Sequence, residues 1–413
     1  LSEACNFKDS MQESLNDNNN IILKISIFCS LIKNKLEEAE LLNSLLLDAQ
    51  DKDEFFQKIY FNLKNEINDP IDFTKVYFDE SSFALYSAML RIGNLPFSEQ
   101  FLDYDPSNLS LPIILSPSTD ISLRLKSAHI AYDLGIFNAE SLSALYQSVD
   151  FTSEELNNTK KTLANFTDSP EMGMALLFQS ARVQLLPITR LVSLKEFWNY
   201  AISNNFEKLA YDVSRNLIES TEPSIELSDY SLYLSRAHIF NKNFEQSKKW
   251  ISFAENYIQQ SDDLNAEKLN NVKFLYDLQI SENNSTFVKT LENNLIKRIE
   301  SEGSLSNYTE TLKTILLTIL DQKNLIDKIE DEKKVFDKRV MPSKYIIDKI
   351  NSSSDNNKIG ELILSTFVSL NGKSWSDVHP QHLQILLNSY KNIKLNDLLK
   401  DIIIEIFEES KII

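Results

Sequence analysis

Residues 229–260 read DYSLYLSRAHIFNKNFEQSKKWISFAENYIQQ, and this stretch decides the expected fold. Apolar and small residues recur in it at helical spacing on both sides of a short polar turn, residues 241–243. They are Leu232, Ser235, Ala237 and Ile239 before the turn, and Phe244, Trp250, Ile251, Ala254 and Tyr257 after it. The stretch predicts two helices folded back on each other, each burying its apolar face.

The composition of the whole chain favours helices. Of its 413 residues, six are Gly and ten are Pro, far below the usual shares of about 7 % and about 5 %. Strand-rich folds need turns roughly every 8 to 12 residues, usually marked by Gly or Pro. The sequence therefore predicts an all-α protein. The length allows either several compact domains or one elongated repeat array.

The chain is strongly acidic. Its 42 Lys and Arg against 60 Asp and Glu give a formal net charge of −18 at pH 7. A field of this sign repels phosphate backbones, so nucleic acid is not an expected partner. The acidity can serve solubility alone or provide a docking surface. No run of 18 or more uncharged apolar residues occurs, so no membrane-spanning segment is expected.

Cys5 and Cys29 are the two cysteines of the chain. They fall in the first two predicted helices, on either side of a polar turn at residues 16–20. An antiparallel hairpin could bring them together in a disulfide, which would suit an oxidising compartment. Two buried thiols acting as small hydrophobes are the alternative. The chain begins at Leu1 rather than Met, as after removal of a leader or a trimming of the sequence.

Proline placement divides the expected chain. Helical patterns cover residues 1–93. Four prolines then fall within 22 residues: Pro96, Pro106, Pro112 and Pro117. Helices do not run through such a density of proline, so residues 94–119 are expected to form a non-helical crossing and the place of any boundary between subdomains. Helical repeats are expected over residues 120–330, and a C-terminal helical cap over residues 331–413.

The stretch at 229–260 resembles a tetratricopeptide repeat, a helical hairpin of about 34 residues. The matching positions are Leu234, Ser235, His238, Phe244, Ser247, Ile251 and Ala254. His238 stands where that family usually has an aromatic residue, and the family's Gly and closing Pro are absent. The resemblance implies a right-handed α-solenoid of antiparallel helix pairs, curved or arch-shaped. Small residues at 235, 247 and 254 would let the helix backbones approach closely.

The whole chain also resembles uncharacterised helical-repeat proteins exported by alphaproteobacteria. In these proteins a helix with a cysteine precedes a second cysteine ahead of the first repeat. Segments 5–29, 123–145 and 382–407 carry the resemblance. It implies a periplasmic location and brings no activity with it, and a cytoplasmic location is the alternative.

The sequence offers little material for catalysis or metal binding. It holds four His and two Cys, and none of the HExxH, GxSxG, GxGxxG or CxxC motifs. The segment Gly372-Lys373-Ser374 resembles the end of a phosphate-binding loop, but Phe367 stands where that loop needs its first Gly.

Each of the four histidines has a structural explanation. His379 and His382 are spaced for a metal on one helix face, yet Pro380 between them favours a capping or surface role. His129 and His238 are expected to be core residues. We therefore expect no enzyme activity, no cofactor and no metal.

The expected function is that of a non-enzymatic scaffold or adaptor in the bacterial cell envelope. It would bind a protein or peptide partner on the solenoid surface, with Tyr230, Tyr233 and Asn241 as the expected contact residues. The alternative is an accessory helical domain of the machinery that processes peptidoglycan. A third possibility is a structural subunit of a larger envelope assembly. The sequence does not indicate an oligomeric state.

Overall fold

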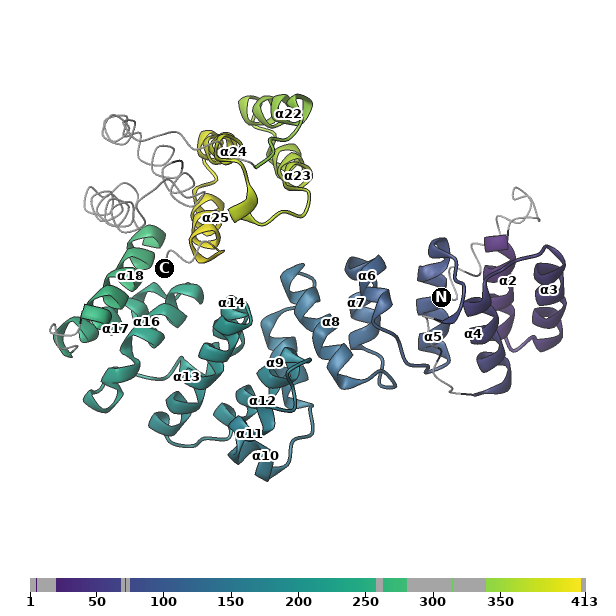
Figure 1. The fold of residues 1–413 in the computed structure, drawn as a ribbon, viewed down its shortest axis with the longest axis horizontal. Coiled ribbons are helices and arrows are strands. Elements are labelled where there is room, and N and C mark those ends of the chain that lie inside the picture. The colour runs from purple at the N-terminus through teal and green to yellow at the C-terminus, as the bar shows by residue number, and fades with distance from the viewer. Residues whose placement is uncertain are drawn as a thin grey trace. The chain divides into compact units, whose positions relative to one another are not determined.

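The computed structural model describes residues 5, 20–67, 71, 75–257, 263–280, 314 and 339–409. The regular structure of these residues is helical throughout, with no strand among them (Figure 1). The prediction of an all-α protein is confirmed. The chain divides into two compact units, unit 1 (residues 1–221) and unit 2 (residues 222–413).

Unit 1 is built from short helices that follow one another closely. They are α2 (Asn20–Ile32), α3 (Leu36–Asp48), α4 (Glu54–Asn65), η2 (Glu80–Ser82), α5 (Phe83–Ile92), α6 (Gln100–Tyr104), α7 (Pro106–Ile114), α8 (Ile121–Asp133), α9 (Ala139–Gln147), α10 (Ser153–Asn157), α11 (Thr159–Leu163), α12 (Pro170–Arg182), α13 (Pro187–Ser203), α14 (Glu207–Val213) and α15 (Arg215–Ile218).

Unit 2 contains the hairpin that the sequence singled out. Its described elements are η3 (Ile225–Tyr230), α16 (Ser231–Phe240), α17 (Phe244–Tyr257), α18 (Asp263–Ile280), α22 (Lys344–Asp355), α23 (Ile359–Leu370), η5 (Trp375–Asp377), α24 (Pro380–Asn392) and α25 (Asn396–Glu409). The expected boundary between repeats and cap at residue 330 lies outside the described residues.

The hairpin α16–α17 has the turn that the sequence predicted. Residues 241–243 join the two helices, and Lys242 adopts a φ of +56° that reverses the chain. Ser235 and Ser247 are fully buried where the helices meet. The Ser247 hydroxyl donates to the backbone carbonyl of Ser235 at 3.1 Å. Small side chains thus allow the close approach, because the separation of packed helices depends on the side chains at their contact.

The expectation of a non-helical crossing at residues 94–119 is wrong for its central part, which forms α6 and α7. Pro106 is the first residue of α7, where its missing N–H is not needed. The Asp105 side chain caps that helix by accepting from the Asn108 amide at 3.2 Å. Pro112 lies inside α7, where it removes one backbone hydrogen bond from a nine-residue helix. The density of proline therefore shortens the helices here without abolishing them.

This segment is not the boundary between the two units either. The Phe97 amide donates to Thr119 Oγ1 at 2.9 Å, and Arg124 Nε donates to the Ile114 carbonyl at 2.9 Å. The Phe101 ring packs edge-on against Phe83 of α5, with ring centroids 5.3 Å apart. Contacts on both sides tie the segment into unit 1. The division falls instead between residues 221 and 222.

A glycine controls the contact between α12 and α13. A Cβ on Gly173 would lie 2.6 Å from Cζ of Tyr200, closer than real Cβ contacts. We expect Gly173→Ala to destabilise unit 1 by about 1–3 kcal/mol, the usual cost of overpacking. Hydrogen exchange of α12 and α13 amides in urea would measure the change.

The matched control is Gly360→Ala on α23. A Cβ at Gly360 would meet nothing within 4 Å, so this variant is expected to gain up to about 1 kcal/mol from helix propensity. Equal effects of the two substitutions would contradict the packing explanation.

Candidate functional site

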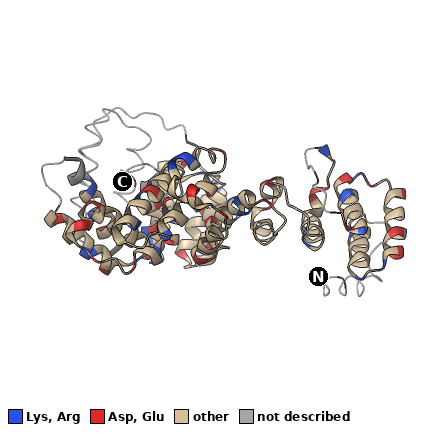
Figure 2. Ribbon diagram, turned by 90° about the horizontal axis from the view of Figure 1, so that it is seen from below, with Lys and Arg blue, Asp and Glu red and all other residues tan. Residues whose placement is uncertain are grey.

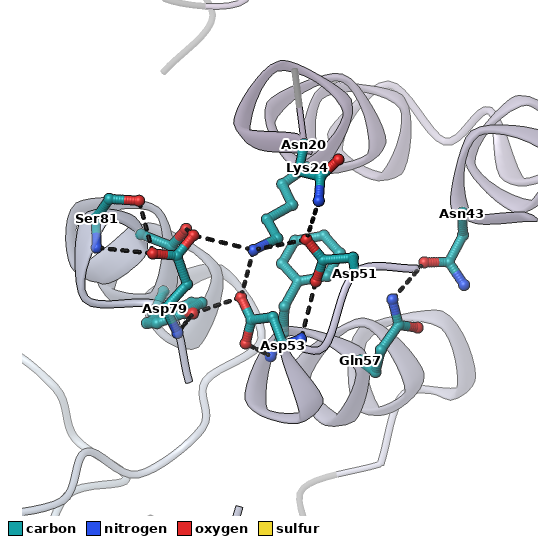
Figure 3. A network of polar contacts seen from close by, with 11 residues as sticks. Asn20, Lys24, Asn43, Asp51, Asp53, Gln57, Asp79 and Ser81 are labelled. Carbon is teal, nitrogen blue, oxygen red and sulfur yellow. Dashed lines mark hydrogen bonds and ion pairs between the residues drawn. The ribbon is translucent and has the colours of Figure 1, made fainter. Parts of the chain in front are cut away.

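A buried network of charged groups surrounds Lys24 of α2 (Figure 3). The Lys24 side chain is only 1 % exposed. Its Nζ lies 2.6 Å from Oδ2 of Asp53, 3.3 Å from Oδ2 of Asp79 and 3.4 Å from Oδ2 of Asp51. These carboxylates come from the segments before α4 and η2. One ammonium therefore joins three parts of unit 1.

The three carboxylates of the network also accept other hydrogen bonds. Their further donors are the backbone amides of Phe56, Asp53 and Ser81, the phenol of Tyr86, the side-chain amide of Asn20 and the hydroxyls of Ser81 and Ser82. The shortest of these bonds runs from the Tyr86 hydroxyl to Asp53 Oδ2, at 2.5 Å. Buried charges are tolerated when they are paired and hydrogen-bonded in this way.

The network holds Lys24 in its charged form. Burial alone would lower the pKa of Lys24, but the hydrogen bond and charge of Asp53, with help from Asp51 and Asp79, raise it above its ordinary value. An ammonium has no lone pair, so at neutral pH Lys24 is neither a nucleophile nor a base. The arrangement fits a clamp that holds α2 against the segments before α4 and η2.

Cys5 and Cys29 form a disulfide with Cα atoms 5.7 Å apart, which confirms the predicted pair. Cys29 lies on α2, five residues after Lys24. The same helix is therefore held by a covalent bond and by the ion network.

Removing this disulfide is expected to destabilise unit 1 by about 3 kcal/mol, because a loop closed over 24 residues loses less entropy on folding when it is cross-linked. The double variant Cys5→Ser, Cys29→Ser and the reduced wild type should show equally faster hydrogen exchange in α2. Added reductant should leave the double variant unchanged. A reductant effect on that variant would show that the loss does not come from the disulfide.

The four histidines have structural roles. His129 Nε2 is hydrogen-bonded to the Tyr146 hydroxyl at 2.6 Å, and His382 Nε2 to the Ser369 hydroxyl at 3.0 Å. His238 is buried in the α16–α17 pair. His379 caps α24, where its Nδ1 accepts from the backbone amide two residues on at 3.2 Å. The expected core positions of His129 and His238 and the expected capping role of His379 are confirmed. The capping or surface role expected of His382 is wrong, because its side chain is buried against Ser369.

Burial keeps three of these imidazoles neutral. It lowers the pKa of His129 to about 3, and it lowers the pKa of His238 and of His382 to about 4. The charge of Glu222 opposes the effect at His238. In the part of the chain that the structure describes, no three His, Cys, Asp or Glu side chains are grouped to hold a metal ion.

The remaining sequence motifs lie in helical surroundings. Residues 372–374 follow the C-terminal end of α23, where Gly372 has a φ of +73°. A phosphate-binding loop instead joins a strand to a helix. Among the described helices, none combines the length and the apolar character needed to cross a bilayer.

The residues that carry the repeat resemblance line the inside of the α16–α17 hairpin. Phe244 is half-buried. The other six are buried: Leu234, Ser235, His238, Ser247, Ile251 and Ala254. The residues expected to contact a partner, Tyr230, Tyr233 and Asn241, are half-buried on or beside α16. Tyr230 and Asn241 flank the two ends of α16 and Tyr233 lies in its first turn, so the three do not form one cluster, and none of them is prominently exposed.

The surface of unit 1 contains a different candidate, the loop between α12 and α13. The large apolar side chains of this loop and of the first turn of α13 face solvent: Val183, Leu185, Leu186 and Ile188, hereafter the loop surface. Leu185 is 90 % exposed and Leu186 is 62 % exposed. Clusters of this kind mark interaction sites more often than single exposed residues do.

The loop surface was not singled out from the sequence, although a usable signal exists. No Asp or Glu occurs between Glu171 and Glu196, while Arg182, Arg190 and Lys195 lie in that interval. Elsewhere acidic and basic positions are scattered over the helices of both units (Figure 2). The loop surface is therefore an apolar, cationic region in an acidic protein.

Comparison with protein-family models, with curated proteins and with solved structures found no match for this chain. The fold and the site define an all-helical protein with a disulfide and a buried ion network in unit 1 and an exposed apolar loop. The ionisable groups described above are held by internal partners or by burial. The exposed apolar side chains have no such structural explanation, and they are the candidate functional site.

Proposed function

We propose that this protein is a non-enzymatic scaffold that binds a protein or peptide partner on the surface of a tetratricopeptide-like helical array. The observation that carries the proposal is the exposure of Leu185 and Leu186 in the loop surface. Burying a leucine side chain contributes about 1.5–3 kcal/mol. Exposure of two leucine side chains to water is unfavourable in free energy, and a bound partner that covers them would remove this penalty.

Packing between helices that are neighbours in the chain supports the array. Contacts join α2 to α3, α7 to α8, α12 to α13, α16 to α17 and α22 to α23. The next helix, α18, packs against both α16 and α17, as the first helix of a following repeat would. Stacked pairs of this kind produce extended surfaces suited to binding other chains.

We place the protein in an extracytoplasmic compartment, such as the periplasm. The Cys5–Cys29 disulfide supports this location because such bonds persist in oxidising compartments. Labelling of thiols in cells after rapid acid quenching tests it. Both cysteines should be unreactive until a reductant is added, and two free thiols in the quenched cells would contradict the location.

Co-purification with loop variants tests the binding function. A tagged wild-type chain should retain partner proteins that the variant Leu185→Ser, Leu186→Ser loses. Leu115→Ser is the matched control, since Leu115 is 65 % exposed in unit 1 but lies outside the loop surface. The control should retain the same proteins as the wild type. Identical retention by all three chains would contradict a binding role for the loop surface.

A further inference from the structure

A second exposed apolar surface lies on α3, also in unit 1. Leu41 is 64 % exposed and Leu45 is 47 % exposed. Residues 38, 41, 45 and 48 share one face of this helix, because their spacings of three and four follow the helical period. Glu38 and Asp48 therefore stand at the two ends of the leucine pair, and Glu38 Oε2 lies 3.0 Å from Nζ of Lys35 in an exposed ion pair that contributes little to stability. These four residues are hereafter the α3 surface.

The loop surface has the opposite arrangement of charge. Its apolar side chains lie between Arg182, at the end of α12, and Arg190, in the first turn of α13. Nε and Nη2 of Arg190 donate to the Gln184 carbonyl at 3.2 and 3.0 Å. These bonds hold the guanidinium beside the loop. The loop surface thus has an apolar centre with an arginine at each end, and the α3 surface has an apolar centre with Asp48 at one end and the Lys35–Glu38 ion pair at the other.

We propose that the loop surface of one copy of this protein docks on the α3 surface of a second copy. The inference rests on the proposed binding function and names the partner. Leucines would meet leucines, while Arg182 and Arg190 would face the carboxylates of Glu38 and Asp48. Electrostatic complementarity of this kind selects partners and sets their register.

Such a contact joins copies head to tail. The two surfaces are different patches of the same chain, so the interface is heterologous, and it leaves one free surface at each end of every assembly. Each surface is defined by four residues, fewer than the roughly 20–30 residues that each partner contributes to a standard interface. We therefore expect weak association, with a dissociation constant on the order of tens of micromolar.

An anionic lipid surface is the competing occupant of the loop surface, since it also attracts apolar and cationic residues. The net charge of −18 would repel the whole protein from such a surface. A second copy offers the carboxylates of its α3 surface, which lie beside exposed leucines. The observations therefore favour a second copy over a membrane.

Sedimentation velocity of the full chain tests the proposal. The wild type should sediment faster as its concentration rises from about 1 to about 500 µM, and association should weaken roughly tenfold in 0.5 M NaCl because exposed charges are screened. Leu185→Ser and Leu41→Ser should each be monomeric alone. Their mixture should form a one-to-one dimer that grows no further, since each variant keeps the surface that the other lacks. Leu115→Ser should assemble like the wild type.

Three results would overturn the proposal: a wild type that is monomeric throughout, a Leu185→Ser chain that still assembles alone, or a mixture that stays monomeric. Loop-dependent binding of the wild type to phosphatidylglycerol vesicles, without self-association, would assign the loop to a membrane instead. Circular dichroism of each variant checks that its fold is unchanged. If the wild type is monomeric while co-purification still depends on the loop, this inference fails and the proposed function stands. If neither self-association nor co-purification depends on the loop, the inference and the proposed function both fail.

Discussion

Lys24→Met is expected to destabilise unit 1 by about 3–5 kcal/mol, the usual effect of removing one partner from a buried ion network. The Lys24 ammonium faces Asp51, Asp53 and Asp79 in a site where Lys24 and Asp53 are each about 1 % exposed. Without it, the carboxylates lie close together with no compensating cation. Hydrogen exchange of α2 and α4 amides in urea would measure the loss.

The matched control is Lys64→Met, which removes a lysine bonded to Glu40 at the protein surface. Surface ion pairs contribute little to stability, so this variant should unfold almost like the wild type. If the α2 and α4 amides of Lys24→Met and of the wild type lost protection at similar urea concentrations, the network would not hold unit 1 together.

Acidification from pH 7 to pH 5 is expected to destabilise unit 2 by about 4 kcal/mol through His238 and His382. Burial lowers the pKa of each imidazole from 6.5 to about 4. The unfolded chain therefore binds more protons than the folded chain between these values, and stability falls as the pH drops below about 6.5. At pH 5 each histidine accounts for about 2 kcal/mol.

Hydrogen exchange of α16 and α24 amides at the two pH values would measure this effect. His238→Gln should remove about half of the pH-dependent change. His382→Gln should remove a similar share of the change. A free energy of unfolding for unit 2 that is unchanged between pH 7 and pH 5 would contradict the neutral, buried state of both imidazoles.

Local patterns explain why much of the fold could be predicted. The α16–α17 hairpin is set by apolar periodicity over about 30 residues around one polar turn, and both helices formed where that pattern indicated. The Cys5–Cys29 pair followed from two predicted neighbouring helices. The helices α6 and α7 were missed because proline was counted by density. Pro106 is the first residue of α7, a position where proline is compatible with a helix.

The site residues were harder to predict because they are separated in the chain. Lys24 meets Asp53 and Asp79 across 29 and 55 residues, and no local pattern links such positions. The exposure of Leu185 depends on what the rest of the fold leaves uncovered, and the sequence around it resembles any buried apolar run. The stretch without acidic residues around that loop was the one local signal for its different surroundings.

Photo-crosslinking from position 185 in living cells tests directly whether the loop surface is a binding site. A benzophenone amino acid in place of Leu185 should give discrete protein adducts after irradiation, because a bound partner would cover that side chain. The same amino acid in place of Leu115, another exposed leucine of unit 1, should give none. Absence of adducts from position 185, or equal adducts from both positions, would contradict the proposed function.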